Sequence, residues 1–196
     1  MRSFMFLAMF LFVVFVASSA FPVIIGVDVS SPYGPVGVQF GGDIAELNFG
    51  DVWWDPSIPP IWKYFTTDGT ETIIHLLEAF HVSGDVPFTD WDEQLFVQDA
   101  TGGWVPSPDT DGLEWLGAQS NPQGTVTIDQ PNDIIVIEWN PALPPCTDVV
   151  IQKEIFVPEG IRYFAIAQWP TVPEPSMLVL GGISLLGLLA YKRKSH

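Results

Sequence analysis

Apolar and β-branched residues recur along the middle of the chain in short segments separated by turn residues. No long stretch has helical spacing, and no internal repeat is present. Residues 125–128 and 149–155 alternate between apolar and polar side chains, as expected for strands with one buried face. The pattern predicts an all-β domain with strands over residues 36–40, 44–49, 70–82, 94–98, 124–129, 133–139, 148–156 and 160–168.

Segment 70–82 also has a second interpretation. Ile73, Ile74, Leu77 and Phe80 satisfy helical spacing as well, although a strand is preferred here. Prolines fall mostly between the predicted strands, where a missing backbone N–H does not interrupt a central ladder. Six to nine strands of this kind suit a β-sandwich.

The beginning of the chain has the features of an export signal. Arg2 precedes an apolar run over residues 4–16, and residues 17–20 are all Ala or Ser, the small residues that a signal peptidase accepts. The run is shorter than the ~20 residues of a stable membrane span. We predict a signal peptide over residues 1–20, cleaved after Ala20, and an uncleaved membrane anchor is the alternative.

Three further signals follow one another near the other end. Pro173 and Pro175 favour an extended backbone and keep Glu174 accessible to a processing enzyme. The apolar stretch 177–190 then predicts a short transmembrane helix, and the basic cluster after it stays cytoplasmic by the positive-inside rule. Together they predict a transient stop-transfer tail, with an ordinary tail anchor on a proline-rich stem as the alternative.

This arrangement over residues 171–196 closely resembles the PEP-CTERM sorting domain. The resemblance implies recognition by an exosortase, an integral membrane transpeptidase-like protease, and removal of the tail near the Pro-Glu-Pro motif. Hosts of such proteins are typically Gram-negative bacteria that make extracellular polysaccharide. The resemblance assigns the sorting motif to Val172, Pro173, Glu174, Pro175 and Ser176, and the basic stop-transfer signal to Lys192, Arg193 and Lys194.

The chain is thus expected to contain a signal peptide (1–20), a β-sandwich ectodomain (21–170) and a sorting segment (171–196). Residues 88–93, together with Gly103, Trp104 and the strand near 151–153, loosely resemble ectodomains often attached to this tail. In those relatives a histidine commonly stands at the place of Asp92. This second resemblance implies architecture and location, and no reaction.

The charge of the chain argues against nucleic acids and anionic membranes as partners. Segment 21–171 holds three basic and 22 acidic residues, and so a formal charge of −19. Such a surface repels nucleic acids and anionic membranes, which bind through clustered Lys and Arg. Cys146 is the single cysteine, so the chain has no intramolecular disulfide, and beside Pro144 and Pro145 it is interpreted as a small apolar filler.

Several Asp and Glu residues stand at alternating positions, as the oxygen ligands of calcium loops do, so calcium is a possible cofactor. The segment 109–114 lacks the closing glutamate and the full ligand series of an EF-hand loop, so acidic turns are the preferred explanation and no cofactor is expected. His75 and His81 would lie ~20 Å apart along a strand and cannot share a metal. The weak metal candidates are Asp90, Asp92, Asp109 and Asp111.

Tryptophans supply the weak ligand candidates. An exposed indole can stack on a sugar ring, but tryptophan is also a frequent core residue of small β-domains, and core packing is preferred for any single one. The weak candidates are Trp91, Trp104 and Trp115, with Trp53 and Trp54 as further possibilities for the same role. The sequence has no Gly-x-Ser-x-Gly elbow and no motif for a Cys-His pair.

The sequence predicts a non-enzymatic exported surface or extracellular-matrix protein sorted by an exosortase. The alternative is a carbohydrate-binding module acting on extracellular polysaccharide. A polysaccharide hydrolase is a third reading, which requires a cleft with two carboxylates about 5–10 Å apart. The expected partners are signal peptidase, exosortase, the inner membrane in passing and extracellular polysaccharide, and the final location is the cell surface or the extracellular space.

Overall fold

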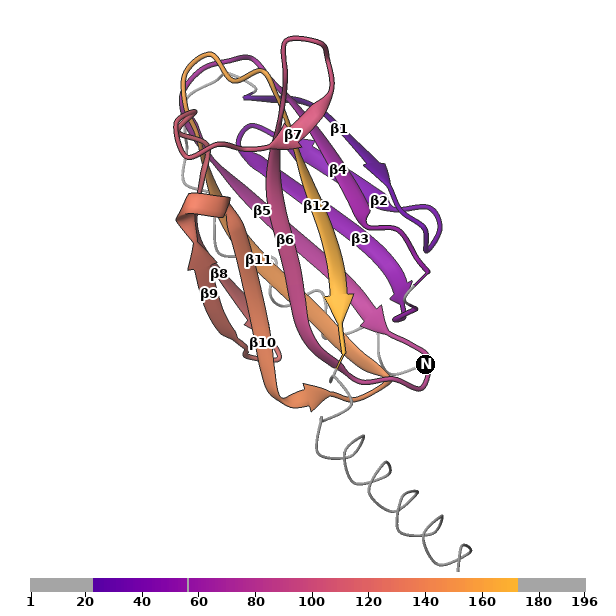
Figure 1. Cartoon of the computed structure of the whole chain (residues 1–196). Helices are drawn as coiled ribbons and strands as arrows, with labels where there is room; N and C mark the ends of the chain where they lie inside the picture. Colours follow the sequence, from indigo (N-terminus) through magenta and orange to yellow (C-terminus); the bar gives the residue numbers. More distant parts are fainter. Residues whose placement is uncertain (1–22, 56, 173–196) are drawn as a thin grey trace, which may run out of the picture.

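The computed structural model describes residues 23–55 and 57–172, and this part of the chain consists of β-strands in two sheets (Figure 1). A single 3₁₀ turn, η2 (Gln130–Asn132), is its only helical element. The strands are β1 (Ile24–Ser30), β2 (Gly37–Gly41), β3 (Ile44–Val52), β4 (Ile61–Thr67), β5 (Thr72–Val82), β6 (Phe88–Gln98), β7 (Trp104–Pro106), β8 (Glu114–Asn121), β9 (Thr125–Asp129), β10 (Ile134–Leu143), β11 (Thr147–Val157) and β12 (Tyr163–Thr171).

The two sheets contain seven and five strands. The larger sheet has the order β1-β4-β12-β6-β10-β9, and β7 also pairs with β6. The smaller sheet has the order β2-β3-β5-β11-β8. All strand pairs are antiparallel except β3 with β5, which run parallel. Strands far apart in the sequence are therefore neighbours, such as β4 and β12 or β5 and β11.

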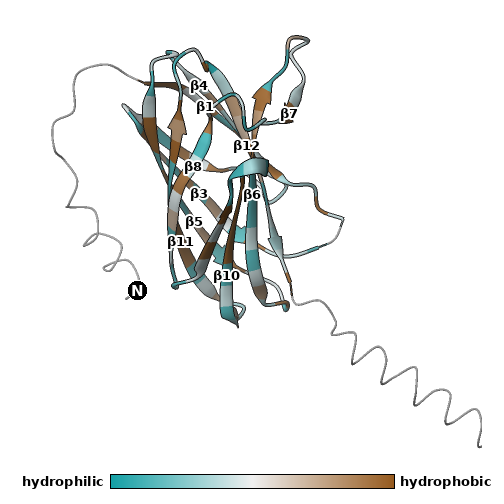
Figure 2. Cartoon of the chain, turned by 60° about the vertical axis from the view of Figure 1, so that its left-hand side comes forward, coloured by the Kyte–Doolittle hydropathy of each residue, from teal (hydrophilic) through white to brown (hydrophobic). Residues whose placement is uncertain are grey.

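Alternating side chains from both sheets fill the space between them. In β5 every second residue from Ile74 to Val82 is buried, and β11 repeats this from Val149 to Val157. The same two-residue period appears as bands of brown and teal along the strands in Figure 2. Aromatic rings stack within the core, where Phe65 and Phe164 lie 4.7 Å apart between centroids. The inner faces thus form one continuous hydrophobic core.

The all-β class is confirmed, and the helical alternative for segment 70–82 is wrong. β5 pairs with β11 along its whole length, from Thr72 opposite Val157 to Val82 opposite Thr147. The helical spacing arose because Ile73 and Leu77 are apolar although they point outward, and Ile73 is 40% exposed.

The expectation of six to nine strands was too low, and β6 begins six residues earlier than predicted. The missed strands are β1, β4, β7 and β8. β4 was missed because its outward positions, Trp62 and Tyr64, are aromatic, so the polar half of the alternation is lost. β8 was missed because Gly117 sits at a register shift opposite β11, which interrupts its two-residue period.

Three prolines lie within strands and are exceptions to the expectation that prolines fall mostly between them; one of them, Pro106, is the last residue of β7. Pro170 lies in β12 beyond Gln168, where pairing with β4 has ended and only β6 continues alongside. Pro141 lies in β10 within a register shift, so it also avoids an intact ladder. Cys146 is exposed with a φ of 64°, so its interpretation as an apolar filler is wrong.

Both predicted terminal segments fall outside the described residues. These are the signal peptide at 1–20 and nearly all of the sorting segment from Pro173 onward. Within residues 23–55 and 57–172, no helix has the length and apolar character needed to span a membrane.

Candidate functional site

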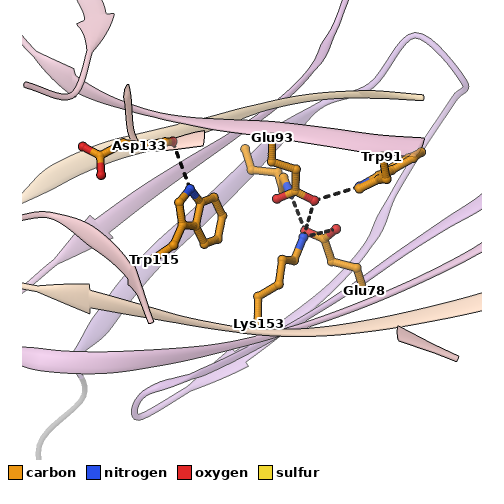
Figure 3. A network of polar contacts seen from close by, with 7 residues as sticks. Glu78, Trp91, Glu93, Trp115, Asp133 and Lys153 are labelled. Atoms are coloured by element: carbon orange, nitrogen blue, oxygen red, sulfur yellow. Dashed lines mark hydrogen bonds and ion pairs between the residues drawn. The ribbon is translucent and has the colours of Figure 1, made fainter. Parts of the chain in front are cut away.

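Four charged side chains meet in the core between the two sheets. Lys63 on β4 and Glu93 on β6 come from the larger sheet, while Glu78 on β5 and Lys153 on β11 come from the smaller one. All four are at most 1% exposed. Each occupies an inward position of its strand, where its neighbours two residues away are apolar. We call these four residues the charge quartet, and Glu78, Glu93 and Lys153 are labelled in Figure 3.

Each lysine of the quartet contacts both glutamates. The Lys63 Nζ is in direct contact with Glu78 Oε1 and lies 3.3 Å from Glu93 Oε2. The Lys153 Nζ is in direct contact with Glu93 Oε1 and lies 2.6 Å from Glu78 Oε2. This last approach forms an ion pair, although its angle is poor for a hydrogen bond. Two positive and two negative charges make the quartet neutral.

Aromatic and amide groups enclose the quartet. The indole N–H of Trp91 donates to Glu93 Oε1 at 2.7 Å, and Phe80 stacks on Trp91 with centroids 4.4 Å apart. Gln168 is buried on β12 opposite Glu93, and its side-chain amide has no hydrogen-bond partner among the described residues. The quartet is therefore shielded from bulk water on several sides.

Burial and pairing move the pKa values of the two lysines in opposite directions. Burial lowers the pKa of Lys63 and outweighs the attraction of Glu78 and Glu93. Burial also acts to lower the pKa of Lys153, but there Glu78 and Glu93 prevail and raise it. Burial acts to raise the pKa of Glu93, and the two ammonium groups outweigh it, so the pKa is lowered. Lys153 and Glu93 therefore form the firmly ionised pair.

The sequence contained a signal for this site that the initial interpretation missed. Lys153 stands between Ile151 and Ile155 on the apolar face of a regular alternation, and Glu78 stands between Leu76 and Phe80 in the same way. A charge in such a position must be paired when it is buried. Two basic and two acidic residues with this pattern could have indicated a neutral buried cluster.

The metal candidates lie on two separate elements. Asp90 and Asp92 share the outer face of β6, while Asp109 and Asp111 belong to the connection between β7 and β8. Burial, and then the neighbouring Asp90, raise the pKa of Asp92 to about 6. Among residues 23–55 and 57–172, no group of three or more His, Cys, Asp or Glu side chains is arranged to hold a metal.

The structure adds a buried carboxylate near Asp111 that sequence reasoning missed. Asp133 follows η2 in the left-handed conformation with φ 49°, and its carbonyl accepts the indole N–H of Trp115 at 3.0 Å (Figure 3). Burial is the main reason why the pKa of Asp133 rises to about 6, with Asp111 and Asp109 adding to the increase. Its Oδ2 has no hydrogen-bond partner among the described residues.

The ligand candidates Trp91 and Trp115 require correction. Both are fully buried, so neither ring can stack on a sugar. Trp91 packs beside the charge quartet, and Trp115 is held by Asp133. Trp104 on β7 is only half-buried. Of the three candidates, Trp104 alone retains access to a ligand.

Trp104 belongs to an aromatic group on the outer face of the larger sheet. We call this group the aromatic strip, and it consists of Trp62, Tyr64, Phe96 and Trp104. The rings of Trp62 and Tyr64 are stacked, with planes nearly parallel at 7° and centroids 6.0 Å apart, and the centroid of Trp104 lies 5.3 Å from that of Tyr64. All four rings are half-buried and come from three strands, β4, β6 and β7.

A hollow of about 200 Å³ lies at the loop that precedes β4. Pro60 and Trp169 line it, and Pro60 stands two residues before Trp62 of the strip. Burial, and then Asp55, raise the pKa of Tyr33 in its wall to about 12, so this phenol remains a hydrogen-bond donor. The full lining is Tyr33, Trp54, Asp55, Ile58, Pro59, Pro60, Trp169 and Pro170.

We expect Lys153→Met to destabilise the protein by about 3–5 kcal/mol, because it leaves the quartet with an uncompensated buried carboxylate. Urea unfolding at pH 7 measures the loss. The matched control is Glu154→Gln on the same strand, where the side chain is half exposed beside His75, and it should change stability by less than about 1 kcal/mol. Equal losses in both variants would contradict a special role for the quartet.

We expect Asp133→Asn to stabilise the protein at pH 7.5 by up to about 2 kcal/mol, because the folded state disfavours the ionised carboxylate. Asparagine also tolerates the left-handed backbone. Below about pH 6 the folded wild type binds this proton before the unfolded chain does. The advantage of the variant should therefore shrink at pH 5 in urea unfolding.

The control for this pH dependence is Asp85→Asn, which changes an exposed carboxylate. The difference in the free energy of unfolding between this variant and the wild type should be the same at pH 7.5 and at pH 5. A constant advantage of Asp133→Asn between pH 7.5 and 5 would show that Asp133 does not titrate in this range.

Comparison with known proteins identifies one segment of the chain. Residues 171–194 match the PEP-CTERM protein-sorting motif, which confirms the resemblance stated from the sequence. No curated protein and no solved structure matches the chain. The matched segment starts at Thr171, the last residue of β12. The chain is a PEP-CTERM sorting domain-containing protein.

Proposed function

We propose that this is a non-enzymatic surface or extracellular-matrix protein, from which an exosortase removes the tail near Pro173-Glu174-Pro175. The sorting motif implies an exported protein that is sorted by an exosortase and anchored transiently at the membrane. The proposal adds the cleavage region, the final location in or near the extracellular polymer, and the absence of catalysis by the ectodomain.

The observation that carries the proposal is the junction between the ectodomain and the motif. β12 pairs with β6 as far as Thr171, where the matched segment begins. The sheet therefore ends immediately before the Pro-Glu-Pro residues, and Pro173 and Pro175 disfavour further ladder pairing. A protease that cuts beyond Thr171 therefore does not need to unfold β12.

The position of the two carboxylates that share Lys153 supports a non-catalytic ectodomain. Glu78 and Glu93 both contact Lys153, but both are fully buried and neutralised by lysines. A glycosidase needs its two carboxylates in a cleft that admits a sugar chain. These two side chains instead stabilise the contact between the sheets.

We expect the protein recovered from its native host to lack the signal peptide and the residues beyond the Pro-Glu-Pro region. In a strain without the exosortase, the tail should remain. Intact mass spectrometry of both samples measures the two ends. The control variant Glu174→Ala should keep the tail in the presence of the exosortase. A mature wild-type form that still carries Lys192 to His196 would contradict the proposal.

A second candidate function, carbohydrate binding by the ectodomain, is favoured by the aromatic strip. Partly exposed rings on the outer face of a sheet can stack on sugars, and the hollow before β4 offers Tyr33 and Asp55 as polar partners. The ectodomain carries a strong negative charge, so it would repel anionic polysaccharides. We therefore infer that a ligand at this face is a neutral glycan.

Affinity gel electrophoresis with neutral glycans tests this function. We expect at least one of hydroxyethylcellulose, galactomannan and dextran to slow the migration of the protein, whereas the anionic glycan alginate should not. Trp62→Ala and Trp104→Ala should each weaken binding about tenfold, or about 1.4 kcal/mol. Phe40→Ala is the control, because Phe40 is 46% exposed on β2 of the other sheet. Binding that is absent, or that Phe40→Ala weakens equally, would contradict this function.

A further inference from the structure

We propose that Lys63 and Glu78 become joined by an amide bond between the lysine Nζ and the glutamate Cδ, formed without an external enzyme after the two sheets have packed. Such an isopeptide bond would link β4 of the larger sheet to β5 of the smaller one. The proposal is independent of the ligand and of the sorting pathway.

The two reacting groups are already in contact. The Lys63 Nζ touches Glu78 Oε1, and both side chains are completely buried. The core holds them together through strands that differ in sheet and are adjacent in the sequence. Fixing an amine beside a carboxyl group in this way replaces an encounter in solution by an intramolecular reaction, which raises the effective concentration enormously.

The amine of Lys63 is the better nucleophile of the two lysines. Burial lowers its pKa, which favours the neutral amine with a free electron pair. The pKa of Lys153 is raised, so that group stays an ammonium ion. This difference assigns the reacting amine to Lys63, although both lysines contact glutamates.

Lys153 and Glu93, the other two members of the quartet, lie close to the reacting groups. Lys153 Nζ lies 2.6 Å from Glu78 Oε2 and can stabilise the negative charge that develops on this oxygen during attack. Glu93 Oε2 lies 3.3 Å from Lys63 Nζ and can accept a proton from it. Trp91 and Lys153 hold Glu93 in this position.

The step is balanced within the quartet. The Lys63 ammonium loses one proton through Glu93, and the neutral amine attacks Cδ of Glu78 to form the C–N bond. The C–Oε1 bond then breaks, and Oε1 leaves as water with two protons that came from the nitrogen. Oε2 becomes the amide carbonyl oxygen beside Lys153. The overall change is one ammonium and one carboxylate to one amide and one water, and no oxidant is involved.

Burial supplies the driving force. An ion held in a protein interior carries a desolvation cost of several kcal/mol even when it is paired. The reaction converts two of the four buried ions into a neutral amide and leaves Lys153 and Glu93 as a single ion pair. The enclosed site also keeps out the bulk water that would hydrolyse the amide.

Mass spectrometry of the full chain purified under denaturing conditions tests the proposal. We expect a mass lower than the sequence requires by one water molecule, with the loss located in a single tryptic peptide that runs through Lys63 and Glu78 to Lys153. Trypsin should not cut after Lys63, because its side chain is an amide. It should still cut after Lys153 and Arg162, which serve as internal controls in the same sample.

Glu93→Gln removes the proton acceptor and keeps the side-chain shape. We expect this variant to regain the mass of one water and tryptic cleavage after Lys63. A wild-type chain with its full sequence mass and cleavage after Lys63 would overturn the proposal, and so would a link through Lys153. If Glu93→Gln does not fold, the mass and the digest of the wild type still decide.

Discussion

The neutral balance of the charge quartet is the constraint on which the packing of the two sheets depends. Each of four strands places one ion in the core, and each ion has a partner of opposite charge on the other sheet, Lys63 with Glu78 and Lys153 with Glu93. A one-residue slip of β5 or β11 would turn Glu78 or Lys153 outward and leave charges without compensation inside. The quartet therefore fixes the register of the sandwich, whereas the apolar core around it supplies most of the burial.

The same arrangement determines the character of the exterior. Segment 21–171 has only three basic residues, and two of them are inside the quartet, so Arg162 is the one that remains for the surface. The exterior is consequently almost purely acidic. Burial, and then neighbouring carboxylates, account for the raised pKa values of Asp92 and Asp133.

The sequence predicted the strands that alternate and failed where alternation was hidden. β11 is regular because its outward positions are mostly polar, but β4 has Trp62 and Tyr64 outward and so lost the signal. The quartet was missed for a related reason, since segment 149–155 was interpreted only as an alternation, and the place of Lys153 between two buried isoleucines was not used. The order of the strands in the sheets determines which charged side chains meet in the core. Local sequence patterns do not reveal this order.

The sorting motif was readable from the sequence because its recognition is local. A protease that acts on an extended peptide requires only neighbouring residues, and residues 171–194 contain them all. The ectodomain differs, because its notable features join residues from distant strands, such as Trp62 with Phe96 or Glu93 with Lys153. A core held together by such contacts can be sensitive to a single lost partner. A chain with one exposed cysteine and no disulfide would gain from a covalent link at its most buried contact.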